Sequence, residues 1–245
     1  MISRRRPNRP LRAPMLTVIV STLWLAGCAS LSETSSENQP EAVNAYTQLG
    51  VAYLERENLT RALSALDHAL EIDPEHPEAL QALALVYQQQ GEAALADKHF
   101  QKALDAAPNF TQARNNYAAF LYQQADYPRA CEQLEQASGD AQYARRAQLF
   151  TNLGQCYTAL GETQRARESF ERAQQIDPRH ARSYFLLAEL AFSQGNISQA
   201  WPPLQTFMQL AAPNREALEL AVEIANARGE FDKAADYQRQ LGQLN

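Results

Sequence analysis

The sequence predicts an all-α protein built from six copies of one helical hairpin, with about twelve antiparallel helices. Three observations lead to this prediction. From Val43 onward the sequence repeats with a period of 34 residues, and a fixed period of this length is the signature of a repeat architecture. Within each copy apolar residues recur every three or four positions, and no stretch alternates as a strand does. Gly or an Asp-Pro pair stands where several of the helices are expected to end.

The copies align without gaps over most of the chain. The first two correspond residue by residue at a spacing of 34: Leu49, Gly50, Tyr53, Ala62, Leu66, Ala69 and Pro74 are matched by Leu83, Ala84, Tyr87, Ala96, Phe100, Ala103 and Pro108. Four further copies follow, of which the fourth matches best, and two extra residues precede it. The predicted repeats cover residues 43–76, 77–110, 111–144, 147–180, 181–214 and 215–245.

Two kinds of residue define the hairpin within each copy. Mostly small residues at the eighth and twentieth positions allow the two backbones to approach. Gly91, Gly161, Gly195 and Gly229 occupy the fifteenth position, where a helix ends in a left-handed residue that Gly adopts most cheaply. This is identified as the tetratricopeptide repeat (TPR) pattern. It implies a right-handed superhelix whose concave face is lined by the first helix of each pair.

A separate segment precedes the repeats. Five arginines without an acidic partner come before an 11-residue, largely apolar run from Met15 to Leu25. This order is typical of an export signal, and the run is shorter than the roughly 20 apolar residues of a membrane span. We therefore predict a signal peptide over residues 1–27; the alternative is a short membrane anchor.

The residues that close this segment resemble the bacterial lipobox. Leu25, Ala26 and Gly27 lead directly to Cys28. The resemblance implies that Cys28 is acylated and becomes the first residue of the mature protein, bound to membrane lipid. Because Ala29 rather than Asp follows, the sorting rule of this class implies the outer membrane, with the protein facing the periplasm. Residues 28–42 are then a lipidated, Ser-rich flexible tether.

The charge balance excludes some partners. The whole chain has a formal net charge of −6, and the predicted signal peptide holds 5 of its 22 Lys and Arg residues. The remainder has 17 basic residues against 28 acidic ones, a net charge near −11. No later stretch clusters Lys and Arg as phosphate binding requires. Nucleic acid and anionic lipid headgroups are therefore poor partners for the repeat domain.

The sequence contains no recognisable catalytic or cofactor motif. The four histidines lack metal-ligand spacing, no CxxC is present, and no Gly-rich phosphate loop or GxSxG elbow opens a helix. We predict a protein that is not an enzyme and that needs no metal and no cofactor.

Two cysteines lie within the repeats. Cys131 is expected on the second helix of repeat three and Cys156 on the first helix of repeat four, and these helices are neighbours in a TPR stack. In an oxidising compartment a close pair forms a disulfide, which would stabilise the fold by about 3 kcal/mol. The alternative is two small buried thiols. The sequence leaves both interpretations open.

The whole mature chain resembles a specific family. The segment NNYAAFLYQQADYPRACEQLEQA (115–137), then YARRAQLFTNLGQCY (143–157), and AYTQLGVAYLERENLTRAL (45–63) in the first repeat are similar to the PilF/PilW pilotins, outer-membrane lipoproteins of type IV pilus biogenesis. The resemblance implies a role in the localisation and assembly of the secretin, the ring through which the pilus crosses the outer membrane, and hence in twitching motility. Its implied partner is the secretin subunit.

Two other hypotheses share the anchor and the fold. One is a TPR scaffold for periplasmic cell-wall hydrolases or proteases. The other is a subunit of an outer-membrane protein insertion complex, which usually has fewer and more divergent repeats. The segment around the insertion, residues 115–157, favours the pilotin.

The partner surface is predicted from the second, fifth, ninth and twelfth positions of each first helix. In repeats one to three these positions hold apolar and amide side chains and no lysine, which suits an amphipathic helix or an extended segment held by a few anchors. In repeat six they hold Glu216, Glu219 and Glu223, which we expect to form a solvated capping face. The candidate partner-binding residues are Thr47, Val51, Leu54, Leu85, Asn115 and Tyr122.

Overall fold

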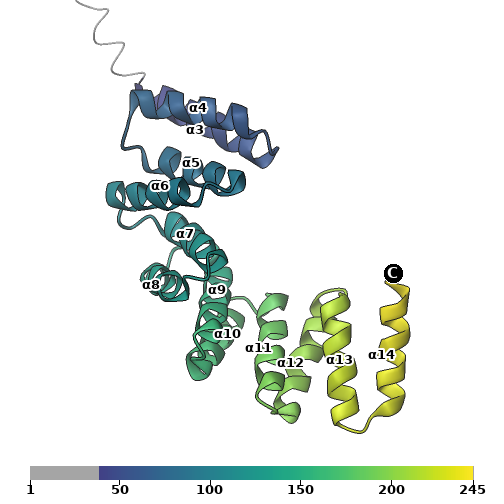
Figure 1. Ribbon diagram of the computed structural model, residues 1–245. Coiled ribbons are helices and arrows are strands. Elements are labelled where there is room, and N and C mark those ends of the chain that lie inside the picture. The colour runs from purple at the N-terminus through teal and green to yellow at the C-terminus, as the bar shows by residue number, and fades with distance from the viewer. Residues whose placement is uncertain (1–38, 245) are drawn as a thin grey trace, which may run out of the picture.

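The structure is a computed structural model that describes residues 39–244. The predicted signal peptide, Cys28 and most of the tether lie outside the described residues. Twelve helices make up nearly all of the described chain, joined by short turns (Figure 1): α3 (Gln39–Glu55), α4 (Leu59–Ile72), α5 (Pro77–Gln90), α6 (Ala93–Ala106), α7 (Thr111–Gln123), α8 (Tyr127–Ser138), α9 (Arg146–Ala159), α10 (Thr163–Ile176), α11 (Ala181–Ser193), α12 (Ile197–Leu210), α13 (Arg215–Ala227) and α14 (Phe231–Gln243).

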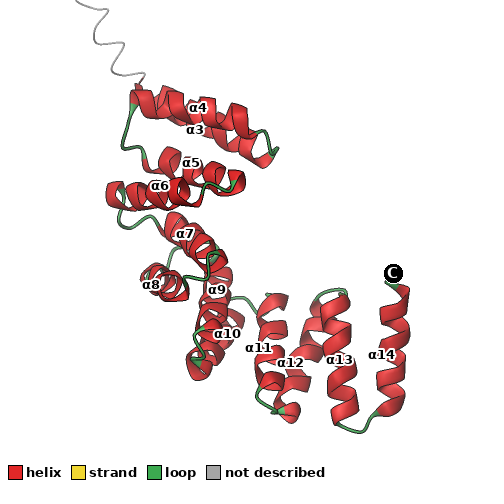
Figure 2. Ribbon diagram, in the orientation of Figure 1, coloured by secondary structure: helices red, strands yellow, loops and turns green. Residues whose placement is uncertain are grey.

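The helices pair in chain order into six antiparallel hairpins that stack into a curved array (Figure 1). No strand occurs between residues 39 and 244 (Figure 2). The predicted all-α TPR superhelix is confirmed. One boundary differs, because α3 begins at Gln39, four residues before the predicted start of the first repeat. Pro40 and Glu41 lie in its first turn, where a fixed φ and a negative charge favour a helix N-terminus.

Small residues allow the two helices of each hairpin to touch. Ala62, Ala96 and Ala166, at the twentieth position, have no exposed surface. At the eighth position, a Cβ added to Gly50 would lie 2.6 Å from Leu66 Cγ, and one added to Gly154 would overlap the ring of Phe170. The spacing of the hairpin therefore depends on the absence of larger side chains at these positions.

All six hairpins turn on a left-handed residue at the fifteenth position. Four of these residues are the predicted glycines, with φ from 72° to 79°. The other two are Glu57 (φ 57°) and Ala125 (φ 59°). A residue with a Cβ is strained in this conformation, so repeats one and three contain turns that their sequences do not favour.

The hydrophobic core is continuous along the stack. One cluster fills repeats two to six, and a second joins repeats one and two. Leu85 and Tyr87 of α5 pack against both clusters. Each hairpin therefore buries its apolar surface against its neighbours, as expected for a repeat protein.

The proline pair of repeat five does not end its helix. Pro202 and Pro203 lie inside α12, which continues to Leu210. Both lie in the second turn, so the carbonyl groups of Ser198 and Gln199, four residues earlier in the helix, receive no N–H hydrogen bond from them. The side chain of Thr206 donates to the carbonyl oxygen of Pro202 at 3.2 Å.

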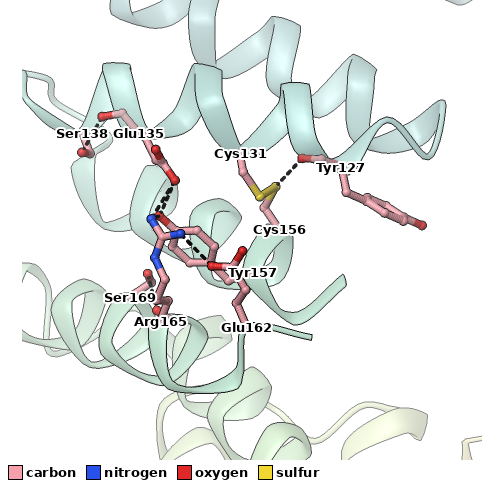
Figure 3. A network of polar contacts seen from close by, with 9 residues as sticks. All are labelled: Tyr127, Cys131, Glu135, Ser138, Cys156, Tyr157, Glu162, Arg165 and Ser169. Atoms are coloured by element: carbon pink, nitrogen blue, oxygen red, sulfur yellow. Dashed lines mark hydrogen bonds and ion pairs between the residues drawn. A yellow bond between two sulfur atoms is a disulfide. The ribbon is translucent and has the colours of Figure 1, made fainter. Parts of the chain in front are cut away.

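Helices α8 and α9 are joined covalently across the insertion. Cys131 and Cys156 form a disulfide, with a Cα–Cα distance of 5.6 Å (Figure 3). Both residues are buried. The connection between these helices covers residues 139–145 and is held by Asp140, whose carboxylate accepts a 2.6 Å hydrogen bond from the hydroxyl of Thr111. This hydrogen bond lowers the pKa of Asp140.

Candidate protein-binding groove

Two adjoining hollows lie between the first helices of repeats three, four and five. The first has a volume of about 180 Å³ and is lined by Ala118, Ala119, Tyr122, Gln123, Leu134, Asn152 and Gln155. The second, of about 300 Å³, is lined by Tyr122, Gln155, Thr158, Phe170, Leu186, Glu189, Leu190 and Ser193. Tyr122 and Gln155 line both hollows, which therefore lie side by side across α7, α9 and α11; together we call them the central groove.

Hydrogen-bonded amides cross the first helices on this side of the stack. Gln148 donates to Asn152 at 2.7 Å, and Asn152 donates to Asn115 at 3.0 Å. Gln88 of α5 donates to Gln123 of α7 at 2.8 Å. These contacts fix the side chains that border the first hollow and leave it with neutral polar walls.

Tyr122 stands between the two hollows. Its side chain is 37% exposed, and its ring centroid lies 5.0 Å from that of Tyr127. Burial, followed by the neighbouring Tyr127, raises the pKa of Tyr122 above its ordinary value. At neutral pH the residue therefore offers an apolar ring and a protonated hydroxyl, a combination common at protein interfaces.

Glu189 introduces a negative charge into the second hollow. It lies on α11 with Leu186 and Leu190, which also line this hollow. Burial, and then repulsion by Glu216, raise the pKa of Glu189, while Arg182 lowers it. Within residues 39–244 no hydrogen bond or ion pair to this carboxylate is present. The groove thus ends in a partly desolvated charge.

The six predicted partner-binding residues lie in different environments. Val51 is exposed and Leu85 is half-buried. Thr47 and Leu54 are buried, and the hydroxyl of Thr47 donates to the carbonyl oxygen of Val43 at 2.8 Å. Asn115 belongs to the amide network, and Tyr122 lines the central groove. Whether any of them contacts a partner stays a prediction.

The partner-binding positions predicted in repeats one to three do not include the residues of the second hollow apart from Tyr122. Its acidic residue, Glu189, occupies the ninth position of repeat five, the same register position as Val51 and Leu85 in repeats one and two. Extending the ninth-position series beyond repeat three would have found it. The packing of Phe170 beneath the hollow could not be inferred in this way, because it depends on how α9 and α11 separate.

Between residues 39 and 244 no group of three or more His, Cys, Asp or Glu side chains is placed to hold a metal ion. No helix in the same range has the length and hydropathy needed to cross a membrane.

Known proteins are similar to this chain both in its repeats and over nearly its whole length. Residues 41–109 and 147–180 match models of the tetratricopeptide repeat. The type IV pilus assembly protein PilF of Pseudomonas aeruginosa is 32% identical over 231 residues, which is 93% of this chain and 92% of that protein. The chain belongs to the PilF family. The similarity covers the insertion and the disulfide region as well as the generic repeat positions.

Solved structures agree with this assignment to the PilF family. The structure of P. aeruginosa PilF superposes with a TM-score of 0.78 at 34% identity, over 84% of this chain and 93% of that one. PilW, described as a widely conserved type IV pilus biogenesis factor, superposes with a TM-score of 0.74 at 24% identity, over 81% of this chain and 91% of that one. The likeness to PilW shows the shared fold.

Proposed function

We propose that this protein is a pilotin, a lipid-anchored binding module needed for the outer-membrane localisation and assembly of the type IV pilus secretin. The observation that supports this function best is the similarity to PilF over nearly the full length of both proteins. Pilus formation and twitching motility would then depend on this protein.

The fold is suited to binding. A stack of six hairpins presents a long surface of first helices, along which a partner segment can lie. In our proposal the secretin subunit contacts the N-terminal half of this surface, where Val51, Leu85 and Tyr122 present apolar side chains. Leu54 and Thr47 support this surface from below, since both are buried.

The binding surface is tested with single substitutions that keep the fold. Val51→Glu and Tyr122→Glu place a charge on exposed side chains, and we expect each to reduce assembled secretin multimers in the outer membrane. Leu54→Glu is unsuitable, because Leu54 is 8% exposed and its replacement would disturb the core. Gln48→Glu, on an exposed residue of the same helix as Val51, is the matched control. Normal secretin assembly in folded Val51→Glu and Tyr122→Glu variants would move the surface elsewhere.

The anchor is tested separately through Cys28. In our proposal its acyl chains are the membrane attachment, and two or more chains hold a protein firmly. Cys28→Ser should release the chain into the soluble periplasmic fraction and leave the secretin unassembled or in the wrong membrane. If the Cys28→Ser protein still fractionates with the outer membrane in a strain without the secretin, the proposed anchor is wrong.

A scaffold for cell-wall hydrolases or proteases is the competing function. It would use the same anchor and the same fold, so the partner distinguishes the two. Affinity purification from detergent-solubilised outer membrane should recover the secretin subunit in amounts comparable to the bait. Recovery of hydrolases or proteases without the secretin would favour the scaffold.

A further inference from the structure

The side chains at one position of the first helices change from apolar to acidic along the stack. This change suggests that the stack binds a ligand of a second kind. At the ninth position of successive repeats the side chains are Val51, Leu85, Ala119, Gln155, Glu189 and Glu223. The series is apolar in the first three repeats, neutral polar in the fourth and acidic in the last two. A partner that follows the stack from α7 to α11 would therefore meet an apolar surface first and a negative charge second.

The central groove concentrates this change into a short distance. Its first hollow adjoins the small side chains of Ala118 and Ala119, with Leu134 beneath. Its second hollow holds Glu189 beside Phe170, Leu186 and Leu190. Glu189 is exposed to solvent, but the apolar residues beside it remove part of the water around its carboxylate, so a cation bound there gains somewhat more than at a fully open surface.

The charges around Glu189 do not neutralise it. No ion pair to Glu189 forms within residues 39–244, and Glu216 of α13 lies close enough to raise its pKa further. Arg182, on the same helix, lowers the pKa of Glu189, but its effect is smaller than that of burial and that of Glu216, so the pKa stays raised. The end of the groove is therefore electrostatically complementary to a cation supplied from outside.

We propose that the central groove binds a protein segment that carries an aliphatic or aromatic residue and, about five or six residues away, a lysine or arginine. The apolar side chain enters the hollow beside Ala119, and the cation reaches Glu189. The spacing follows from the fold. Helix α9 lies between α7 and α11, so the two sites are two helix spacings apart, roughly 16 to 20 Å. An extended segment advances about 3.3 Å per residue, which gives about five or six residues. This proposal concerns repeats three to five and does not depend on the secretin being the partner of the N-terminal repeats.

The amide residues of the groove explain how such a segment is held. Gln155 lies between the two hollows and belongs to both linings, next to Tyr122. Its side chain can donate to, or accept from, the backbone of an extended segment, as can the hydroxyl of Tyr122. Backbone contacts would therefore fall between the two side-chain sites, which is the arrangement that fixes the direction of a bound peptide.

The test uses phage-displayed random nine-residue peptides selected on the purified full chain in detergent. We expect the selected peptides to combine an apolar residue with Lys or Arg about five or six positions away. Their synthetic, fluorescein-labelled copies should bind Glu189→Gln at least 5-fold more weakly by fluorescence anisotropy, and higher salt should weaken binding to the native chain. Ala119→Leu, which fills the first hollow from an exposed position, should remove the preference for the apolar residue and keep that for the cation.

Two further variants keep the test decisive. Glu171→Gln removes the same charge from an exposed residue of α10 and should change affinity less than 2-fold. Glu189→Lys should reverse the selection towards Asp and Glu. Selections without a basic residue, selections that Glu189→Gln leaves unchanged, or no enrichment at all would each overturn the proposal, provided that circular dichroism shows the variants folded.

Discussion

The guanidinium carbon of Arg165 lies 4.0 Å from the ring centroid of Tyr157, and both side chains bind the same oxygen of Glu135 (Figure 3). The hydroxyl of Tyr157 donates to Glu135 at 2.9 Å, and Arg165 donates to it at 2.7 Å. These residues come from α9, α10 and α8, so the contact joins the second helices of two successive repeats. We call it the Glu135 clasp.

The same clasp occurs one repeat earlier with different residues. Tyr117 donates to Asp97 at 2.6 Å, and Arg129 donates to it at 2.9 Å. Burial, followed by the hydrogen bond to Asp97, raises the pKa of Tyr117 to about 12. Both arginines occupy the nineteenth position of their repeats. The recurrence indicates that a buried tyrosine hydroxyl and a cross-repeat carboxylate stabilise the stack between its second helices.

Tyr157→Phe tests the contribution of the Glu135 clasp. The substitution keeps the ring and removes one hydrogen bond to a charged acceptor, so we expect the free energy of unfolding to fall by about 1.5 kcal/mol, the low end for a charged acceptor because Glu135 is partly exposed. Urea denaturation measures the change. Tyr184→Phe is the control, since its hydroxyl makes a 3.3 Å contact to the carbonyl oxygen of Pro178 at the surface. If both variants lost the same free energy of unfolding, the Glu135 clasp would contribute no more to stability than an ordinary surface hydrogen bond.

At the left-handed turns, substitution to glycine and substitution from glycine should change stability in opposite directions at equivalent positions of the repeat. Glu57 and Ala125 have φ near 57° and 59°, where a Cβ costs energy. Glu57→Gly and Ala125→Gly should each stabilise the protein by about 0.5 to 1 kcal/mol, the gain being reduced by the greater freedom of glycine in the unfolded chain. Thermal unfolding measures both.

The reverse substitution at a turn that already holds glycine is the matched control. Gly161 has φ 75°, and an added Cβ would meet no atom within 4 Å. Gly161→Ala should therefore destabilise the protein by about 1 kcal/mol through the backbone alone. If Glu57→Gly lowered the melting temperature, the left-handed conformation of that turn would be in doubt.

Ala96→Leu tests the hairpin register. Ala96 has no exposed surface, and a larger side chain there must push the two helices of repeat two apart. We expect a loss of about 1 to 3 kcal/mol from overpacking, spread over the neighbouring repeats because their cores are continuous. Ala94→Leu, on an exposed residue of the same helix, should leave the thermal midpoint nearly unchanged. An Ala96→Leu variant as stable as the native chain would contradict the assigned register.

The sequence predicts the stack well because its determinants are local. The eighth and twentieth positions must be small wherever two helices touch, so Gly154 and Ala96 reveal the hairpin without knowledge of the rest of the chain. The left-handed turns are harder to predict from the sequence. Glu57 and Ala125 adopt a conformation that their residue types disfavour, and only the strong pattern of the flanking helices places them.

The binding surface is less predictable, because it depends on how much each first helix rotates. Thr47, at the fifth position, is buried, whereas Val51, at the ninth, is exposed. A periodic pattern gives the order of these positions but not the angle at which one hairpin packs on the next. The disulfide depended on the same unknown, since the distance between Cys131 and Cys156 follows from how α9 packs on α8 after the insertion.

Glu189→Gln gives a pH-dependent prediction that is independent of any ligand. Burial and Glu216 raise the pKa of Glu189 in the folded chain above its ordinary value of 4.5. The folded state therefore binds this proton more tightly than the unfolded state, and the free energy of unfolding falls as pH rises through that range. Glutamine has no proton to lose, so Glu189→Gln should be more stable than the native chain at pH 7, by a few tenths of a kcal/mol at this exposed position.

The difference should vanish under acidic conditions. Below about pH 4 the carboxyl is protonated in the folded and the unfolded chain, and the two proteins should unfold at similar urea concentrations. Glu171→Gln, which changes the net charge equally, should show no such gain at pH 7. If Glu189 lowers stability at neutral pH, it behaves as expected of a binding residue whose cationic ligand is absent. If Glu189→Gln is instead less stable than the native chain, the carboxylate is already paired within the fold.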